Sequence, residues 1–388
     1  MSVRTDFPVV GVVGGGQLAR MMQPAAINLG VTLRVLAAGP QESAAQVIPD
    51  AVVGDEKNVA DLLAFAEGCD VVTFDHEHVH PDHLQALEEA GHIIRPGRQA
   101  LLHAQDKGVM RERMTALGVA NPRHHIVATP DQAAAFAEQL PPEGSGDRSV
   151  VLKTTRGGYD GKGVWLSDAT DIASEPFAAG VPVLVEEPVD FRRELAAVAV
   201  RSPHGQAVAY PVVESVQIEG ICREVIALAP GLAEDVAVQA QRLALQVAAE
   251  IGVVGVLVVE LFETTDGDLV VNELAMRPHN SAHWSIDGAV TSQFENHLRA
   301  VLDLPLGDPS AQAPYTVMVN ALGGDLDGVY GTYKHLLARD PALKVHWYGK
   351  AVRPGRKIGH VNLTGADVAD LRERGWHAAD YIAGVIDE

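Results

Sequence analysis

The chain has 388 residues, of which 47% are hydrophobic and 21% are charged. This length and composition are typical of a globular protein with two or three domains, and they exclude a disordered or fibrous chain. The formal net charge of −21 disfavours binding to nucleic acid or to an anionic membrane surface, so we expect neither as a partner.

The sequence shows no sign of export or of a membrane span. The N-terminal residues lack the apolar stretch of a signal peptide, and the longest apolar run, near Val253–Val259, is too short to cross a bilayer. The two cysteines, Cys69 and Cys222, lack metal-ligand spacing, which disfavours both a zinc site and a disulfide scaffold. We therefore expect a cytoplasmic protein.

The first part of the chain alternates strands with helices. The expected strands are Val9–Val13, Val31–Leu36 and Val71–Phe74, and the expected helices are Gln17–Leu29, Val59–Glu67 and Asp82–Ala90. This alternation predicts a parallel sheet that is covered by helices on both faces.

A glycine-rich turn, residues 14–19, follows the first strand and has the spacing of a dinucleotide-binding fingerprint. That fingerprint also needs an acidic residue at the end of the second strand, but this strand ends in Val35–Gly39, and Glu42 already lies in a loop. We therefore disfavour a nicotinamide cofactor. Two interpretations stay open: backbone N–H groups that cradle a phosphate, or a tight turn without a ligand.

A helical stretch, Gln99–Leu117, leads into a region of short strands separated by glycine and proline. We predict a separate, smaller antiparallel module with strands at Val150–Lys153, Val164–Leu166, Val183–Glu187 and Leu195–Val200. A long amphipathic helix then covers Glu234–Ile251 and must pack on a sheet. Further on we expect strands up to Phe262 and at Leu269–Leu274, a helix over Val290–Leu302, and a linker, Leu304–Pro314, into a small terminal domain.

Lys153 ends one strand, and a loop with four glycines in seven residues connects it to the strand that starts at Val164. So many glycines favour a loop whose amides close over phosphates while Lys153 and Lys162 supply charge, although a solvated hairpin is the simpler alternative. The strand from Val183 stops at two acids, and its backbone there could pair with a purine edge. Taken alone, acids at a strand end are commonplace.

The most informative geometry lies between residues 256 and 274. If Asp266 and Gly267 are the central residues of a hairpin turn, Glu260 falls directly opposite Glu273. Two facing carboxylates destabilise a sheet unless a cation lies between them, and Mg²⁺ typically combines one or two carboxylates with nucleotide phosphates. A different turn length would separate the pair.

Two further segments favour anion binding. The loop after Glu273 collects five polar side chains, and the stretch from Ala342 to Ala366 contains five basic residues and no acid, which suits a phosphate monoester. These residues are Arg277, His279, Asn280, Ser281 and His283 in the loop, and Lys344, Lys350, Arg353, Arg356 and Lys357 in the basic stretch.

Together these motifs resemble 5-(carboxyamino)imidazole ribonucleotide synthetases of the ATP-grasp superfamily. The resemblance rests on residues 14–21, 157–163, 272–273, 278–281 and 355–360. It implies a mixed α/β fold with a Rossmann-like N-terminal domain (1–104), an ATP-grasp domain (105–312) with a lid at about 124–190, and a small C-terminal domain (313–388). It also implies a homodimer that uses ATP and Mg²⁺, with Mn²⁺ as a possible substitute, to carboxylate aminoimidazole ribonucleotide with bicarbonate.

The resemblance assigns roles to individual residues. Asp160 resembles the acid–base residue, Lys162 and Arg277 share the catalytic region, and Glu260 and Glu273 would bind the metal. Residues implied to hold ATP are Lys107, Lys153, Gly158, Tyr159, Asp160, Gly161, Lys162, Gly163, Glu186, Glu187, Pro188, Val189, Glu194, Asn272 and Glu273. Residues implied to contact the nucleotide substrate or bicarbonate are Gln17, Glu77, Tyr159, Arg277, His279, Asn280, Lys350 and Arg356.

Two segments depart from the family pattern: Asp75-His76-Glu77 stands where a Glu-x-Glu type is usual, and Met276 stands where proline is usual. Residue patterns alone leave other activities open. These are a formate-dependent transformylase, a biotin carboxylase-like ligase, a nicotinamide-dependent oxidoreductase and a non-catalytic nucleotide sensor.

Overall fold

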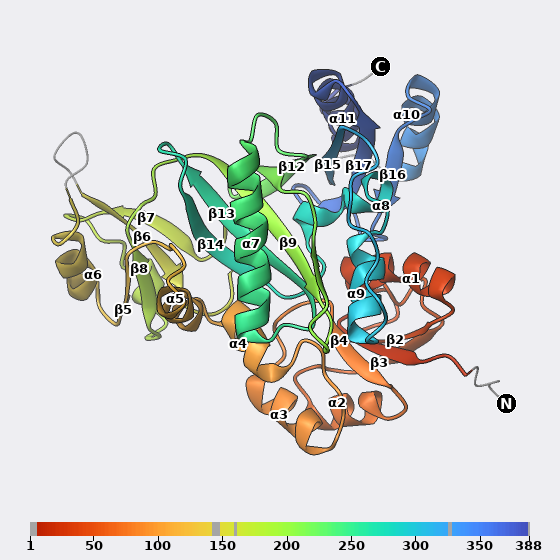
Figure 1. Cartoon of the computed structure of the whole chain (residues 1–388), viewed down its shortest axis with the longest axis horizontal. Coiled ribbons are helices and arrows are strands. Elements are labelled where there is room, and N and C mark those ends of the chain that lie inside the picture. Colours follow the sequence, from red (N-terminus) through yellow and green to blue (C-terminus); the bar gives the residue numbers. More distant parts are fainter. Residues whose placement is uncertain (1–5, 142–147, 159–160, 325–327, 387–388) are drawn as a thin grey trace.

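The computed structural model describes residues 6–141, 148–158, 161–324 and 328–386. Three sheets form its framework, and helices cover their faces (Figure 1). In the described ranges, no helix combines the length and the apolar character that crossing a membrane requires.

The N-terminal sheet is parallel, as predicted, with strand order β3-β2-β1-β4. Its strands are β1 (Val9–Val13), β2 (Thr32–Ala37), β3 (Asp50–Val53) and β4 (Val71–Phe74), with helices α1 (Gln17–Leu29), α2 (Val59–Ala66) and α3 (Pro81–Glu89). Val10 and Val12 pack in one core with α1 and with the later helix α9 (Gln293–Val301), whereas Val13 packs with α2 and α3 on the other face. Helices therefore cover both faces, and one of them comes from far along the chain.

The predicted helix at Gln99–Leu117 is instead two helices, α4 (Arg98–Gln105) and α5 (Lys107–Ala116). The break is at Asp106, whose backbone is extended and whose carboxylate accepts the N–H groups of Gly108 and Val109 at the start of α5. Ser, Thr, Asp and Asn favour this position because their side chains satisfy amides that have no partner inside the helix. The cap places Lys107 at the first position of a new helix.

The second sheet is antiparallel and has the strand order β5-β8-β6-β7. It consists of β5 (His124–Val127), β6 (Ser149–Thr154), β7 (Val164–Asp168) and β8 (Val183–Glu186), with α6 (Pro130–Ala137) and the short helix η1 (Glu175–Phe177). The smaller antiparallel module is thus present, but assigning Leu195–Val200 to it was wrong. That segment belongs to β9 (Phe191–Arg201), which pairs with β11 (Val213–Ile218) and β13 (Gly255–Thr264) inside the largest sheet.

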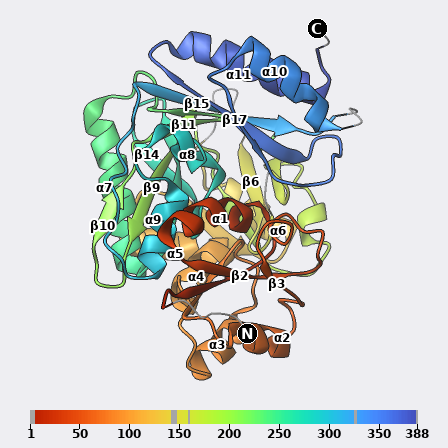
Figure 2. The same ribbon diagram turned by 90° about the vertical axis from the view of Figure 1, so that its right-hand side faces the viewer.

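The largest sheet has nine described strands and runs through the centre of the molecule into its C-terminal part (Figures 1 and 2). In order these are β14 (Leu269–Ala275), β13 (Gly255–Thr264), β9, β11 (Val213–Ile218), β12 (Ile221–Ala227), β15 (Tyr315–Leu322), β17 (Lys357–Gly365) and β16 (Lys344–Trp347), with β10 (Ala207–Ala209) beside β9.

Helix α7 (Glu234–Ile251) has the bounds predicted from its periodicity and lies against the central sheet, with Ala240, Ala244, Val247 and Ala248 buried. The connection to the C-terminal strands carries η2 (Asn280–Ala282), α8 (Ser285–Gly288) and α9.

In its described residues, the C-terminal segment extends the central sheet and forms no separate sheet. Its strand β15 pairs directly with β12, and η3 (Val329–Thr332), α10 (Tyr333–Arg339) and α11 (Val368–Ala383) pack on its strands. Arg372 of α11 also donates to the fully buried carboxylate of Glu224 on β12, at 2.9 Å and 3.0 Å. Continuous backbone pairing and this ion pair, in which Glu224 is buried and Arg372 is half-exposed, hold the C-terminal strands against the rest of the chain.

Candidate active site

The two glutamates predicted to face each other do so: Glu260 on β13 pairs with Glu273 on β14. The predicted two-residue turn, however, is wrong. The loop between Thr264 and Asp268 has three residues, closed by a hydrogen bond from the Gly267 N–H to the Thr264 carbonyl at 3.0 Å, with Gly267 at φ 90°. A bulge at Asn272 then adds one residue to β14 and restores the expected pairing. Two deviations from the predicted hairpin cancel at the position of the glutamates.

Two lysines from different elements meet this hairpin. Lys107, at the start of α5, forms an ion pair with Glu273. Lys153, on β6, donates to Asn272 at 3.1 Å and forms an ion pair with Glu186 at 2.8 Å. The bulged Asn272-Glu273 dipeptide is therefore flanked by two cations, which is the charge arrangement that a polyphosphate requires.

A buried ion network fixes Lys153 from behind. The Glu186 side chain is almost fully buried and pairs with Lys153 and also with Arg111 of α5, which in turn donates to the Val271 carbonyl at 2.9 Å. Although burial opposes its charge, Lys153 and Arg111 lower the pKa of Glu186. The Glu186 carboxylate is thus occupied by protein cations and positions Lys153. Sequence reasoning missed Arg111, because an arginine on a helix normally lies at the surface.

The glutamates at the hairpin carry more negative charge than the nearby cationic side chains balance. Burial, followed by the charges of Glu273 and Glu194, raises the pKa of Glu260 to about 8, although Arg277 and Lys357 oppose this. Burial likewise raises the pKa of Glu194 to about 7. An added cation would relieve both costs.

Within the described ranges, no three His, Cys, Asp or Glu side chains come together closely enough to hold a metal by themselves. A divalent ion at the hairpin would therefore need oxygen ligands from a bound phosphate in addition to the two glutamates, which is the usual coordination of Mg²⁺ in nucleotide sites.

The glycine-rich loop after β6 depends on its glycines. Gly157, Gly158, Gly161 and Gly163 all have φ between 71° and 81°, a backbone conformation that side-chain-bearing residues rarely adopt. A Cβ at Gly163 would also lie 2.7 Å from the Thr154 hydroxyl. Lys162 is exposed. Tyr159 and Asp160, assigned to ATP, substrate and proton transfer, lie outside the described residues.

The segment 186–189 leaves β8 beside the antiparallel sheet. Its Glu187 exchanges two hydrogen bonds with Arg123: the Glu187 N–H donates to the Arg123 carbonyl, and the Arg123 N–H donates to the Glu187 carboxylate at 2.8 Å. The N–H of Glu187 is therefore used within the protein. Pro188 and Val189 follow, both half-buried.

Arg277 and Glu77, both predicted to contact the substrate, contact each other. Arg277 Nε lies 2.6 Å from Glu77, which also accepts the Met276 N–H at 3.2 Å. This ion pair joins the N-terminal parallel sheet to the loop after β14. Met276 stands where proline is usual in the family. It therefore has a backbone N–H to donate to Glu77, which proline would lack.

His279 and Asn280 lie beside the glutamates. His279 Nε2 is 3.6 Å from Glu260, but burial, with Arg277 and Lys357, lowers the pKa of His279 to about 3, so its ring is neutral. The Asn280 amide is buried without a well-formed hydrogen bond among the described residues. His283, also expected in this anion pocket, instead packs in the core with its ring 5.1 Å from that of His360.

The glycine-rich turn before α1 already has an internal anion. Asp75 accepts the Ala19 N–H at 2.7 Å, and a Cβ at Gly16 would lie 1.9 Å from its carboxylate. Burial raises the pKa of Asp75. One of the two interpretations of this turn was a bound phosphate. The carboxylate of Asp75 lies there instead, which favours the interpretation as a tight turn without a ligand.

The residues of the basic stretch lie in different surroundings. Lys350 donates to the Gln17 side chain, which brings two predicted substrate residues together. Arg356 is exposed, and its side chain makes a long contact of 3.4 Å to the Ala351 carbonyl. Lys357, which received no role in the sequence analysis beyond membership of this stretch, is close enough to affect the charges of Glu260 and His279.

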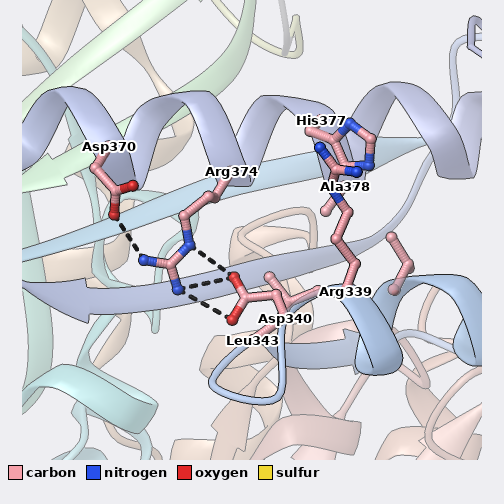
Figure 3. A pocket seen from close by; sticks show the side chains of 8 residues that line it. Arg339, Asp340, Leu343, Asp370, Arg374, His377 and Ala378 are labelled. Carbon is pink, nitrogen blue, oxygen red and sulfur yellow. Dashed lines mark hydrogen bonds and ion pairs between the residues drawn. The ribbon is translucent and has the colours of Figure 1, made fainter.

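A pocket of about 490 Å³ between α10 and α11 contains none of the predicted site residues (Figure 3). Its Arg374 is neutralised by Asp340 and Asp370, at 2.8 Å and 2.7 Å. This pocket therefore lacks the unbalanced charge that marks the hairpin site.

Comparison with known families matches three consecutive segments. The ribonucleotide synthetase preATP-grasp domain matches residues 8–105, the ATP-grasp domain matches 112–294, and the phosphoribosylaminoimidazole carboxylase C-terminal domain matches 316–374. N5-carboxyaminoimidazole ribonucleotide synthase of Mycobacterium tuberculosis is 56% identical over 383 residues, which covers 97% of this chain and 88% of that protein. The chain belongs to the N5-carboxyaminoimidazole ribonucleotide synthase family. It is an ATP-dependent ligase of purine biosynthesis.

Solved structures of the same family agree with the fold. The synthetase from Thermus thermophilus superposes with a TM-score of 0.85 at 35% identity and covers 98% of this chain and 99% of that one. The synthase from Aspergillus clavatus in complex with ADP and 5-aminoimidazole ribonucleotide superposes with a TM-score of 0.87 at 30% identity, covering 98% and 100%. The mixed α/β ATP-grasp fold predicted from the sequence is confirmed.

Proposed function

We propose that the hairpin site performs ATP-dependent carboxylation of 5-aminoimidazole ribonucleotide with bicarbonate. The products would be N5-carboxyaminoimidazole ribonucleotide, ADP and phosphate. The observation that carries this proposal is the facing pair Glu260 and Glu273 with Lys107 and Lys153 beside it. Family relatives in complex with ADP and with the aminoimidazole nucleotide support it.

ATP would lie with its phosphates at the bulged Asn272-Glu273 dipeptide and its base toward the segment 186–189. Lys107 and Lys153 would contact the phosphates, while Glu194, whose carboxyl is half-buried with a raised pKa, would accept a hydrogen bond from the sugar. Glu260 and Glu273 would hold Mg²⁺, or Mn²⁺ in its place, which when bound neutralises phosphate charge. The raised pKa of Glu260 supports a cation here.

The aminoimidazole nucleotide would bind where the N-terminal sheet meets the C-terminal strands. Gln17 and Lys350 are joined there, and we assign the substrate phosphate to Lys350 and to the exposed Arg356. Glu77 holds Arg277 in place, so that Arg277, with His279 and Asn280, would face bicarbonate.

Bicarbonate is a poor electrophile and must be activated. One of its oxygens would attack the γ-phosphorus, the bond to the β-phosphate oxygen would break, and ADP would leave, giving carboxyphosphate. The exocyclic amine would then attack the carbonyl carbon, the carbon–oxygen bond to phosphate would break, and the amine would lose a proton. Lysine charges placed in advance stabilise the charge that builds up on the transferred phosphoryl group.

Because carboxyphosphate hydrolyses readily, water must be kept away from it. We assign this to the glycine-rich loop, with Asp160 as the acceptor of the amine proton and Lys162 as a phosphate contact. Both assignments rest on the family resemblance. Asp160→Asn should abolish carboxylation while ATP hydrolysis without the amine persists.

Three further proposals concern the whole protein. We propose a cytoplasmic homodimer, and we propose the domain division 1–104, 105–312 and 313–388, with the lid at about 124–190. Light scattering coupled to size-exclusion chromatography measures the mass, and a value near 41 kDa, the mass of one chain, would contradict the dimer.

An ADP-release assay tests the proposed function. We expect full turnover only with ATP, bicarbonate and 5-aminoimidazole ribonucleotide together, and loss of turnover in Glu273→Gln. Glu250→Gln, at an exposed ion pair on α7, is the matched control and should keep it. ADP release that depends on formate or on biotin would favour the other ligase reactions.

A further inference from the structure

Helix α5 and strand β6 are neighbours in Figure 1, and three interactions connect the end of β6 to the start of α5. The Lys107 N–H donates to the Thr155 carbonyl at 2.8 Å, Asp106 and Arg156 form an isolated backbone bridge, and Arg156 Nε pairs with the Asp106 carboxylate at 2.8 Å. We call this group, residues 106–107 with 155–156, the α5–β6 splice.

The splice lies next to both cations of the phosphate region. Lys107 is part of it and reaches Glu273, while Lys153, two residues before Thr155, reaches Asn272. The two lysines come from different elements and contact neighbouring residues of the same bulged dipeptide. Their relative position thus depends on two links between β6 and α5, the buried network of Arg111, Glu186 and Lys153 and the splice.

Asp106 has two functions at once. One carboxylate oxygen accepts the N–H groups of Gly108 and Val109 at 3.1 Å and 3.2 Å, which caps α5, and the other accepts Arg156 Nε. Its side chain is 16% exposed, whereas Arg156 is 51% exposed. Arg156 therefore contacts the residue that caps α5, the helix that carries Lys107.

We propose that Arg156, through Asp106, is a positioning residue that sets the distance between Lys107 and Lys153 for binding of the ATP phosphates. This inference rests on the proposed function and deepens it by assigning a role to Arg156, which the proposed function gives no contact with ATP or metal. The Gln17 and Lys350 contacts proposed for the aminoimidazole nucleotide lie outside the splice, so we expect its binding to change little.

Steady-state kinetics with both substrates varied test the proposal. Because a half-exposed ion pair is weak, we expect Arg156→Ala to raise KM for ATP about three- to fivefold. The KM for 5-aminoimidazole ribonucleotide should stay within about twofold, and Arg156→Lys should restore most of the ATP affinity. Arg98→Ala, which breaks a half-exposed pair between Arg98 on α4 and Glu88 on α3, is the matched control and should change neither constant.

A double-mutant cycle separates positioning from folding. Asp106→Asn keeps an oxygen that can cap α5 but removes the charge, so Arg156→Ala should have no further effect on KM for ATP in that background. Equal effects in both backgrounds, or an unchanged KM for ATP, would overturn the proposal. If the wild-type enzyme shows no ADP release that depends on the aminoimidazole nucleotide, the proposed function itself has failed.

Discussion

Glu260→Gln should stabilise the ligand-free protein while it abolishes turnover. Glu260 has its pKa raised from 4.5 to about 8 by burial and by Glu273 and Glu194. The folded state therefore holds a proton that the unfolded state releases, and the wild type loses stability as pH rises from about 4.5 to about 8. The full shift corresponds to at most about 5 kcal/mol. Since 26% of the side chain is exposed, we expect about 2–4 kcal/mol after screening.

Thermal unfolding at pH 5 and pH 8.5 measures this difference. Near pH 5 the two proteins should be similar, and at pH 8.5 the variant should melt several degrees higher. Glu263→Gln on the same strand is a control with the opposite sign, because Glu263 is fully buried and Arg192 and Arg193 lower its pKa. That variant should melt lower at both pH values. A Glu260→Gln protein no more stable than wild type at pH 8.5 would refute the argument that the hairpin lacks a cation.

Three further substitutions test the buried network and the loop. Arg111→Met should destabilise the protein by about 3–5 kcal/mol, measured by urea denaturation, because it leaves Glu186 buried with only Lys153 as partner; an unchanged midpoint would contradict this. Lys153→Met should remove ATP binding in calorimetry, since it removes the positive charge beside Asn272 that would contact the phosphates, and retained affinity would exclude a phosphate contact. Gly163→Ala should lower turnover at least tenfold because its φ is 78°, and normal rates would show that the loop tolerates another backbone conformation.

The sequence predicts elements whose periodicity is strong and local. Helix α7 has its predicted bounds, and the strands β1 and β4 are as expected. Strands β3 and β5 were not predicted, because four-residue strands with few buried positions do not show a clear alternation. The assignment of Leu195–Val200 to the wrong sheet has another origin, because pairing partners depend on tertiary contacts that a local pattern does not encode.

The candidate site was predictable where residue type alone dictates chemistry. Glu260 and Glu273 face each other, but the bulge at Asn272 that aligns them depends on the backbone path of the neighbouring strand. The burial of Arg111 and the insertion of Asp75 under the glycine-rich turn both require knowing which elements pack together. A polar residue in a sequence does not show whether its partner is solvent, ligand or protein.

The fate of bicarbonate oxygen tests the central claim most directly. With ¹⁸O-labelled bicarbonate, ATP and 5-aminoimidazole ribonucleotide, attack of bicarbonate on the γ-phosphorus places one labelled oxygen in each phosphate released, which mass spectrometry detects. Phosphate without label, formed at the same rate as the carboxylated product, would contradict activation of bicarbonate as carboxyphosphate at this site.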